Sequence, residues 1–148
     1  YQLGVNRGFS LIEILVVLFL IGLAYALAAP TIGSGAASLE LKSATRQLAA
    51  ALRKARGVAI TQRQEAVLSL DVTAKKFAVS GEIKAYALPM NVELSLFTAQ
   101  SEQVLDQVGN IRFFPDGTST GGRITLSVGN ARNALDVDWL TGKVTATP

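Results

Sequence analysis

An apolar run of membrane-spanning length dominates the N-terminal third of this 148-residue chain. No charged residue occurs from Ile14 to Leu39, and Ile14–Ala29 is almost continuously apolar. With residues 9–12 the run reaches about 20 residues, enough for a helix that crosses a hydrocarbon core of about 30 Å. Because Arg7 precedes the run, the positive-inside rule predicts a cytoplasmic N-terminus and an exported remainder. A signal peptide cleaved at Ala26–Ala29 is the alternative, but the apolar pattern continues into further helix instead of stopping.

Glu13 places a carboxylate inside this run. A carboxylate at the bilayer centre costs about 2.5–3.5 kcal/mol on insertion scales, and less near the interface. One interpretation is therefore a tolerated interfacial glutamate. The other requires a cationic partner: cleavage between Gly8 and Phe9 would give Phe9 a free amine, which could neutralise Glu13 of a neighbouring subunit.

The segment RGFSLIEILVVLFLIGLAYALAAP, residues 7–30, resembles the class III signal of type IV pilins and type II secretion pseudopilins. Such signals combine a short basic leader, a glycine at the cleavage site, a phenylalanine next and a glutamate at the fifth mature position. The resemblance implies that a prepilin peptidase cleaves after Gly8 and N-methylates Phe9. It also implies that Glu13 acts in subunit register and assembly, and that Pro30 kinks the helix.

Four segments follow from the resemblance and from the residue patterns beyond it. They are a partial prepilin leader at 1–8, a transmembrane or filament-core helix at 9–30, an amphipathic helix half at 31–65 and a periplasmic β-rich head at 66–148. Because Tyr1 is not a methionine, we expect either that the leader is longer than the chain shown or that its start was modified.

The second helix half has one apolar and one basic face. Pro30 and the Gly33-Ser34-Gly35 stretch predict a kink or a short melted stretch at about 29–36, and the helix should end between 57 and 65. The apolar face, at a spacing of about 3.6 residues, comprises Leu41, Ala44, Leu48, Ala51, Leu52, Ala55 and Ala59. The basic face comprises Lys42, Arg46, Arg53, Arg56 and Arg63.

Three interpretations of the basic face remain open. It is a solvated surface, or it pairs with acidic surfaces of neighbouring subunits or with lipid headgroups, or it binds DNA. The last is the weakest, because no aromatic residue interleaves with the charges to stack on bases.

After Glu65 the pattern is that of β-strands. Strands are expected at 66–72, 76–80, 83–88, 92–97, 111–114, 123–128, 134–140 and 144–147, with turns near 73–75 and at Thr141-Gly142. The region from Ala99 to Gly109 is polar and is expected to be a loop. The residue patterns therefore predict an α+β fold, with a long N-terminal helix packed on a C-terminal β-rich head, and the resemblance implies that this fold is type IV pilin-like.

Composition excludes several kinds of chemistry. The chain has no cysteine and no histidine, so disulfides, histidine-based catalysis and the usual zinc sites are absent. Asp116 in a Pro-Asp-Gly turn could bind calcium, but no second carboxylate lies nearby in sequence. From Ala66 onward, seven basic and eight acidic residues give a net charge of −1, which does not favour nucleic acid. We expect no enzyme activity, no cofactor and no metal.

Two further stretches, LRKARGVAITQRQEAVLSLD at 52–71 and FFPDGTSTGG at 113–122, resemble the H-type minor pseudopilins of type II secretion, the GspH/FimT family. The resemblance implies a structural subunit that helps initiate or cap the periplasmic pseudopilus driving exoproteins across the outer membrane. Its expected partners are other pseudopilins, prepilin peptidase and the inner membrane, with an exoprotein as a further partner. The alternative is a minor pilin of a type IV pilus, acting in pilus assembly or DNA uptake.

Overall fold

The computed structural model describes residues 8–105 and 107–148, with the backbone alone for residues 28–34, 100, 104 and 105. The leader residues 1–7, including Arg7, therefore lie outside the described residues. The chain divides into two compact units, Tyr1–Ala36 and Ala37–Pro148.

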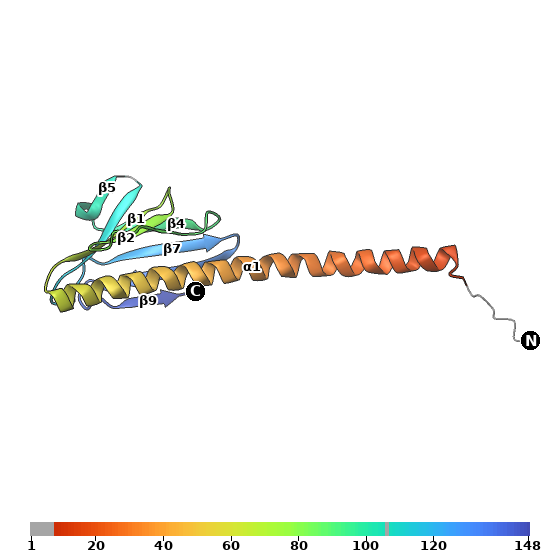
Figure 1. Cartoon of the computed structure of the whole chain (residues 1–148), viewed down its shortest axis with the longest axis horizontal. Helices are drawn as coiled ribbons and strands as arrows, with labels where there is room; N and C mark the ends of the chain where they lie inside the picture. The colour runs from red at the N-terminus through yellow and green to blue at the C-terminus, as the bar shows by residue number, and fades with distance from the viewer. Residues whose placement is uncertain (1–7, 106) are drawn as a thin grey trace, which may run out of the picture. The chain divides into compact units, whose positions relative to one another are not determined.

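One helix, α1 (Leu11–Gln62), belongs to both units (Figure 1). Its end at Gln62 falls within the predicted window. The melted stretch predicted at 29–36 is wrong, since the backbone is helical on both sides of Pro30 and through it. A proline removes one hydrogen bond from the helical ladder, and the leucine- and alanine-rich residues before it favour helix strongly. The kink at Pro30 stays a prediction.

The strands lie in the unit Ala37–Pro148 and form two antiparallel sheets. They are β1 (Ala66–Asp71), β2 (Lys76–Val79), β3 (Tyr86–Ala87), β4 (Glu93–Thr98), β5 (Gln103–Leu105), β6 (Val108–Phe113), β7 (Gly122–Val128), β8 (Ala131–Val137) and β9 (Val144–Thr147). A short 3₁₀ helix, η1 (Gln100–Glu102), precedes β5. One sheet has the order β3-β2-β1-β6-β5 and the other the order β4-β7-β8-β9.

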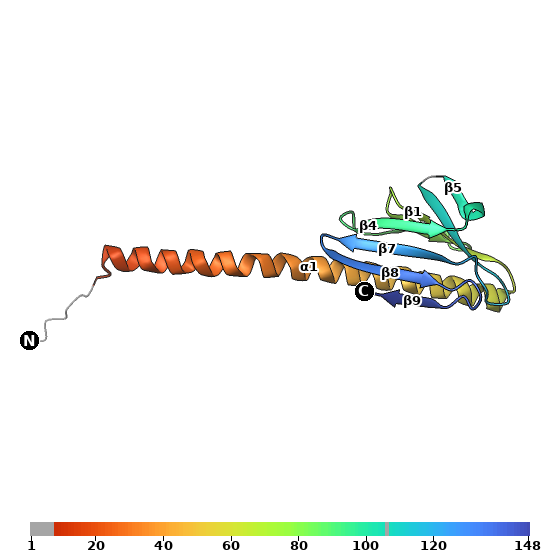
Figure 2. The same ribbon diagram turned by 180° about the vertical axis from the view of Figure 1, so that it is seen from behind.

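The core of this unit lies between the sheets and the second half of α1. From the helix, Leu48, Leu52 and Ala55 are fully buried, as the helical spacing predicted. The strands contribute alternate residues, for example Leu68 and Leu70 from β1. The four-stranded sheet covers one side of this half of α1 (Figures 1 and 2). This confirms the predicted class, an N-terminal helix packed on antiparallel β-structure.

Three strand predictions need correction. The strand predicted at 134–140 lies at Ala131–Val137, because Asp138 begins the turn that leads to β9. Of the segment predicted at 83–88, only Tyr86 and Ala87 pair, because β3 is an edge strand opposite the short β2. The polar region from Ala99 to Gly109 is not a plain loop, since it contains η1 and β5 and the start of β6. The polar sequence of this region shows neither helical nor strand periodicity, although Glu102 within it is buried and pairs with Arg112.

Candidate functional site

The residues that precede α1 form the predicted processing site. Gly8, Phe9 and Ser10 have no regular secondary structure, and the helix begins at Leu11. The Oγ atom of Ser10 accepts a hydrogen bond from the N–H of Glu13 at 3.2 Å. Ser10 is therefore an N-cap that satisfies one of the free N–H groups of the first turn. The sequence analysis missed Ser10, although its Ser-x-x-Glu spacing is a capping-box signal.

The predicted cleavage position is accessible within the described residues. The Phe9 side chain is 78% exposed, and no heavy atom lies within 4 Å of a Cβ built on Gly8. Packing against the described residues therefore does not require glycine at this position. Exposed, irregular backbone is the form in which chains are most readily cut.

Glu13 lies in the first turn of α1 and is exposed. A carboxylate there interacts favourably with the positive end of the helix dipole. Together with Phe9 and the apolar residues Ile14 and Val17, it lines a shallow recess of about 250 Å³. Pairing of Glu13 with the amine of a neighbouring Phe9 stays a prediction, because the nitrogen of Phe9 is part of a peptide bond in this chain.

Beyond Glu13 the helix presents apolar side chains on every side. The large apolar residues from Phe9 to Leu27 are between 48% and 78% exposed. Among the residues that the structure describes, no helical segment meets both the length and the hydropathy needed to cross a membrane.

On the basic face, two arginines are held by the chain itself. Arg53 donates from Nη2 to the carbonyl oxygen of Val144 at 3.3 Å. Arg56 donates from Nε to the carbonyl oxygens of Gly117 at 3.3 Å and Thr141 at 3.2 Å. These bonds fasten the second half of α1 to β9 and to the two loops at 114–121 and 138–143. Both arginines therefore have a structural role that the sequence did not predict.

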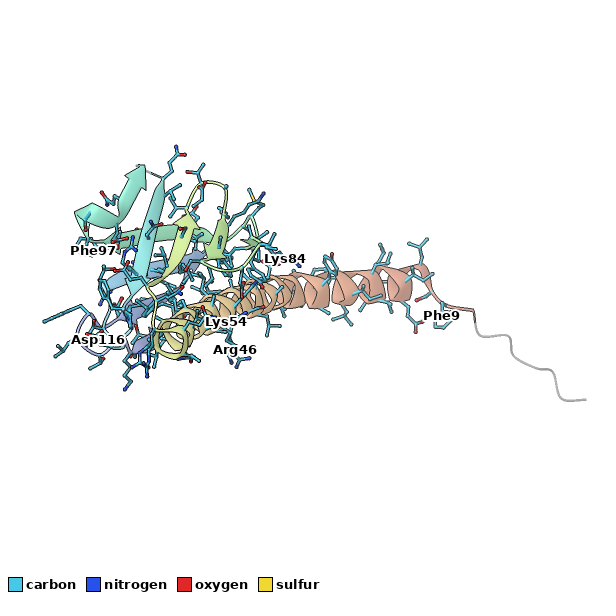
Figure 3. The ribbon with its side chains drawn as sticks, turned by 60° about the vertical axis from the view of Figure 1, so that its left-hand side comes forward. Phe9, Arg46, Lys54, Lys84, Phe97 and Asp116 are labelled. Atoms are coloured by element: carbon cyan, nitrogen blue, oxygen red, sulfur yellow. The ribbon has the colours of Figure 1, made fainter. Side chains whose placement is uncertain are left out.

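The remaining cations of this face, Lys42, Arg46 and Arg63, are exposed. Arg46 points away from the sheets (Figure 3). The contact of this face with a neighbouring subunit stays a prediction, and these three side chains are the ones best placed to make it.

Gly142 allows the two loops to meet at Arg56. Its φ of 67° lies in the left-handed region, and a Cβ there would lie 2.8 Å from Nε of Arg56 and still closer to the carbonyl oxygen of Gly117. Since a carbonyl oxygen of the backbone cannot move aside alone, only glycine fits at this position. The loop from FFPDGTSTGG is therefore part of the packing of the head.

Two aspartates stabilise these loops. Asp116 accepts hydrogen bonds at Oδ1 from the hydroxyl of Thr118 at 2.6 Å and from its N–H at 3.0 Å, and both bonds lower the pKa of Asp116. Asp138 accepts from the N–H groups of Thr141 at 3.0 Å and Leu140 at 2.8 Å, which lower its pKa. Asp116 thus acts within its own turn. The described residues contain no group of three acidic, histidine or cysteine side chains able to hold a metal.

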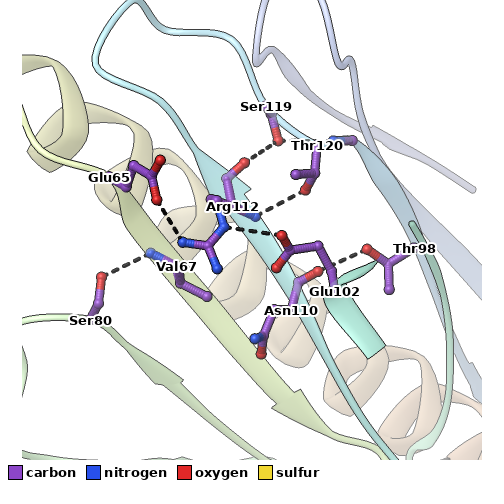
Figure 4. Close-up of polar contacts among 10 residues, drawn as sticks. Glu65, Val67, Ser80, Thr98, Glu102, Asn110, Arg112, Ser119 and Thr120 are labelled. Atoms are coloured by element: carbon purple, nitrogen blue, oxygen red, sulfur yellow. Dashed lines mark hydrogen bonds and ion pairs between the residues drawn. The ribbon is translucent and has the colours of Figure 1, made fainter. Parts of the chain in front are cut away.

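A further polar cluster, not predicted from the sequence, surrounds Arg112 on β6 (Figure 4). Its Nε donates to Glu102 at 3.0 Å and its Nη1 to Glu65 at 2.8 Å. Glu102 is the larger cause of the raised pKa of Arg112. The backbone of Arg112 also bonds the hydroxyls of Ser119 and Thr120. Arg112 thus links three parts of the chain. They are the segment that follows α1, the 3₁₀ helix η1, and the loop that precedes β7.

The chain matches two family models. One, described as "Type II transport protein GspH", matches residues 44–142, and the other, "Prokaryotic N-terminal methylation motif", matches residues 4–29. A protein of Xanthomonas campestris pv. campestris named "Type II secretion system protein H" is 38% identical over 142 residues. That alignment covers 96% of this chain and 83% of the relative.

Two solved structures share the fold. The minor pseudopilin EpsH from the type 2 secretion system of Vibrio cholerae matches with a TM-score of 0.59 at 11% identity, over 73% of this chain and 96% of that chain. The type IV minor pilin FimU of Pseudomonas aeruginosa matches with a TM-score of 0.58 at 18% identity, over 75% of this chain and 90% of that chain. At these identities the likeness shows the fold alone, and it confirms the type IV pilin-like class.

Proposed function

Because the chain belongs to the GspH family of type II transport proteins, we propose that it is a minor pseudopilin of the type II secretion system. It is a structural subunit that helps initiate or cap the periplasmic pseudopilus, which drives exoproteins across the outer membrane. One observation carries the proposal: a methylation motif at residues 4–29 and the GspH region at residues 44–142 occur together in one chain.

Prepilin peptidase cuts the chain between Gly8 and Phe9 and methylates the new amine of Phe9. The open surroundings of Gly8 and the exposure of Phe9 support this step. Ser10 supports it as well, because the N-cap makes the helix begin after the bond that is cut.

Before assembly, the first part of α1 resides in the inner membrane and the head lies in the periplasm. A helix that is apolar on every side needs either lipid or other helices around it, and Phe9 to Leu27 is such a segment. In the pseudopilus the same side chains pack against helices of the other pseudopilins.

The role is assembly and not catalysis. The sequence relationship is to a type II secretion protein, whereas the likeness to a type IV minor pilin is one of fold. No observation therefore favours the alternative of a minor pilin that acts in pilus assembly or DNA uptake. The near-neutral charge of the residues from Ala66 onward also does not suit nucleic acid.

Mass spectrometry of the chain from cells that carry the complete secretion system tests the proposal. We expect a mature chain that begins with N-methylated Phe9, and a Gly8→Glu variant that stays uncut in the inner membrane. Gly8→Ala is the matched control, since it adds one methyl group and no charge and should impair cleavage less. Mature chains that begin after Ala29 would show an ordinary signal peptide and contradict the proposal.

A further inference from the structure

β9 is an edge strand whose outer side faces away from the rest of its sheet (Figure 2). Among the described strands it pairs with β8 alone, from Val137↔Val144 to Ala134↔Thr147. Residues 145–148 are exposed. An edge of this kind presents backbone groups to which another strand can bond.

The hydrogen bonds next to β9 show which of its backbone groups point outward. The N–H of Asp138 donates to the carbonyl oxygen of Lys143 at 3.0 Å, so Lys143 directs its backbone toward β8. Along an antiparallel strand this direction alternates from residue to residue. Thr145 therefore also bonds toward β8, whereas Val144 and Ala146 direct their N–H and C=O groups outward.

The bond from Arg53 to the carbonyl of Val144 agrees with this direction and already occupies that group. The outward N–H and C=O of Ala146 have no hydrogen-bond partner among the described residues. A groove of about 230 Å³ lies beside Ala146, between β9 and α1, with Lys42 and Arg46 at its helical side. Two exposed cations thus lie beside the free backbone groups of an edge strand.

The helical wall of this groove is fixed in position. Thr45 is buried, donates its hydroxyl to the carbonyl of Leu41 at 2.8 Å and accepts from the side chain of Asn133 at 3.2 Å. These bonds tie α1 to β8 next to Lys42 and Arg46, so the cations project from a rigid support.

We propose that the outer edge of β9, together with Lys42 and Arg46, binds an extended acidic segment of a neighbouring subunit. The segment adds to the four-stranded sheet as a further strand, bonds the backbone of Ala146 and pairs its carboxylates with the two cations. This inference rests on the proposed function, because the pseudopilus supplies the neighbouring subunit. Anionic lipid would use the same cations but has no need of the backbone of Ala146.

The test uses the full chain in micelles of an uncharged detergent and two labelled eight-residue peptides, one alternating Glu with Val and the other Lys with Val. Fluorescence anisotropy should show the acidic peptide binding about tenfold or more tightly than the basic one, and less tightly at high salt. Ala146→Pro removes an outward N–H while leaving the bonds to β8 in place, so it should weaken acidic-peptide binding about tenfold. Ala146→Val keeps the N–H and is its matched control.

Reversing the two charges tests the cations separately. Lys42→Glu with Arg46→Glu should abolish binding of the acidic peptide, whereas Lys76→Glu with Lys84→Glu, which changes the net charge equally at exposed positions outside the basic face, should not. A cooperative thermal unfolding transition shows that each variant folds. If Ala146→Pro does not fold, the comparison of the two charge-reversal variants tests the inference by itself.

Three results would overturn the inference. In the first, the Ala146→Pro and Ala146→Val variants bind the acidic peptide equally well, and in the second, the parent chain binds the acidic and the basic peptide equally well. In the third, the Lys42→Glu, Arg46→Glu variant no longer binds phosphatidylglycerol vesicles but still binds the acidic peptide. In cells, methylation of Phe9 is measured by mass spectrometry and entry into the pseudopilus by cross-linking, on the same variants. Chains that are methylated and assembled but do not bind the peptide refute this inference alone, whereas an unmethylated parent chain counts against the proposed function.

Discussion

Replacing Gly142 with alanine should loosen the junction at which two loops meet α1. At a φ of 67° the left-handed backbone destabilises alanine by about 1–2 kcal/mol. The added methyl group would also overlap the carbonyl oxygen of Gly117, so the loops must separate. Arg56 then loses bonds of 3.3 and 3.2 Å to the carbonyls of Gly117 and Thr141, about 1 kcal/mol each. The free energy of unfolding should therefore fall by about 3–4 kcal/mol.

Gly129→Ala is the matched control. Gly129 has a φ of 58°, but no heavy atom lies within 4 Å of a Cβ at this position. Its substitution should lower the free energy of unfolding by about 1–2 kcal/mol, the backbone contribution alone. Urea unfolding of a fragment comprising 37–148, followed by circular dichroism, measures both values, because every buried apolar residue that the structure describes lies in this unit.

The Arg56→Met variant separates the two contributions. If the extra loss at Gly142 arises from Arg56, then Gly142→Ala should destabilise the Arg56→Met chain by clearly less than it destabilises the parent. Equal losses for Gly142→Ala and Gly129→Ala would refute the reasoning. Full additivity of Gly142→Ala and Arg56→Met would show that the two residues do not act together.

Two further predictions concern polar groups of the head. Arg112→Met leaves the carboxylate of Glu102, whose side chain is 8% exposed, without its cation. The free energy of unfolding, measured in the same urea assay, should therefore fall by about 2–4 kcal/mol. Adding Glu102→Gln to this variant should recover part of the loss, because it removes the unpaired charge. The pKa of Asp138 is lower in the folded chain than in the unfolded one, so its stabilising contribution is present above a pH of about 4 and is lost as the pH falls through the folded pKa. Asp138→Asn should therefore lower the thermal midpoint near neutral pH and have little effect in strong acid, and an equal effect at both pH values would contradict this.

The sequence predicted the elements whose local pattern is strong. Alternating apolar residues and turn chemistry located β1, β2 and β9 to within a residue at each end. The helical spacing identified Leu48 and Leu52 as buried, because tertiary packing needs the same stripe that the sequence displays. The N-terminal methylation motif is confirmed over residues 4–29, whereas the roles predicted for Phe9 and Glu13 within it stay predictions.

The sequence did not show what covers each face. A helical spacing places Arg53 and Arg56 on one basic face, but the carbonyls that bind them lie in β9 and in two loops, all more than 60 residues further along the chain. Likewise, Glu102 lies in a polar stretch without periodicity, and only its pairing with Arg112 explains its burial. Contacts between polar residues that are far apart in the sequence produce no local sequence pattern, so they could not be predicted from it.

Glu13 has two possible tasks that substitutions can separate. In the proposed pseudopilus its carboxylate meets the amine of a neighbouring Phe9 inside an apolar core, where opposite charges attract strongly and an unpaired charge is penalised. In the chain itself Glu13 belongs to the first helical turn, which Ser10 caps. Glu13→Leu removes both the charge and the polar side chain from this turn, whereas Glu13→Gln removes the charge alone, and Ser10→Ala removes the cap and keeps the charge.

If charge pairing sets the register of subunits, Glu13→Gln and Glu13→Leu should both be cut normally and enter pseudopili poorly, whereas Ser10→Ala should assemble. Cleavage is followed by gel shift and incorporation by cross-linking through single introduced cysteines, which are unambiguous because the chain has none of its own. Normal assembly of Glu13→Gln would show that register does not depend on the charge. Poor assembly of Ser10→Ala, with Glu13 intact, would instead assign the defect to the start of the helix. The charge is the better candidate, because the other side chains of this segment are nearly all apolar and interchangeable, and only an ion pair distinguishes one axial position from the next.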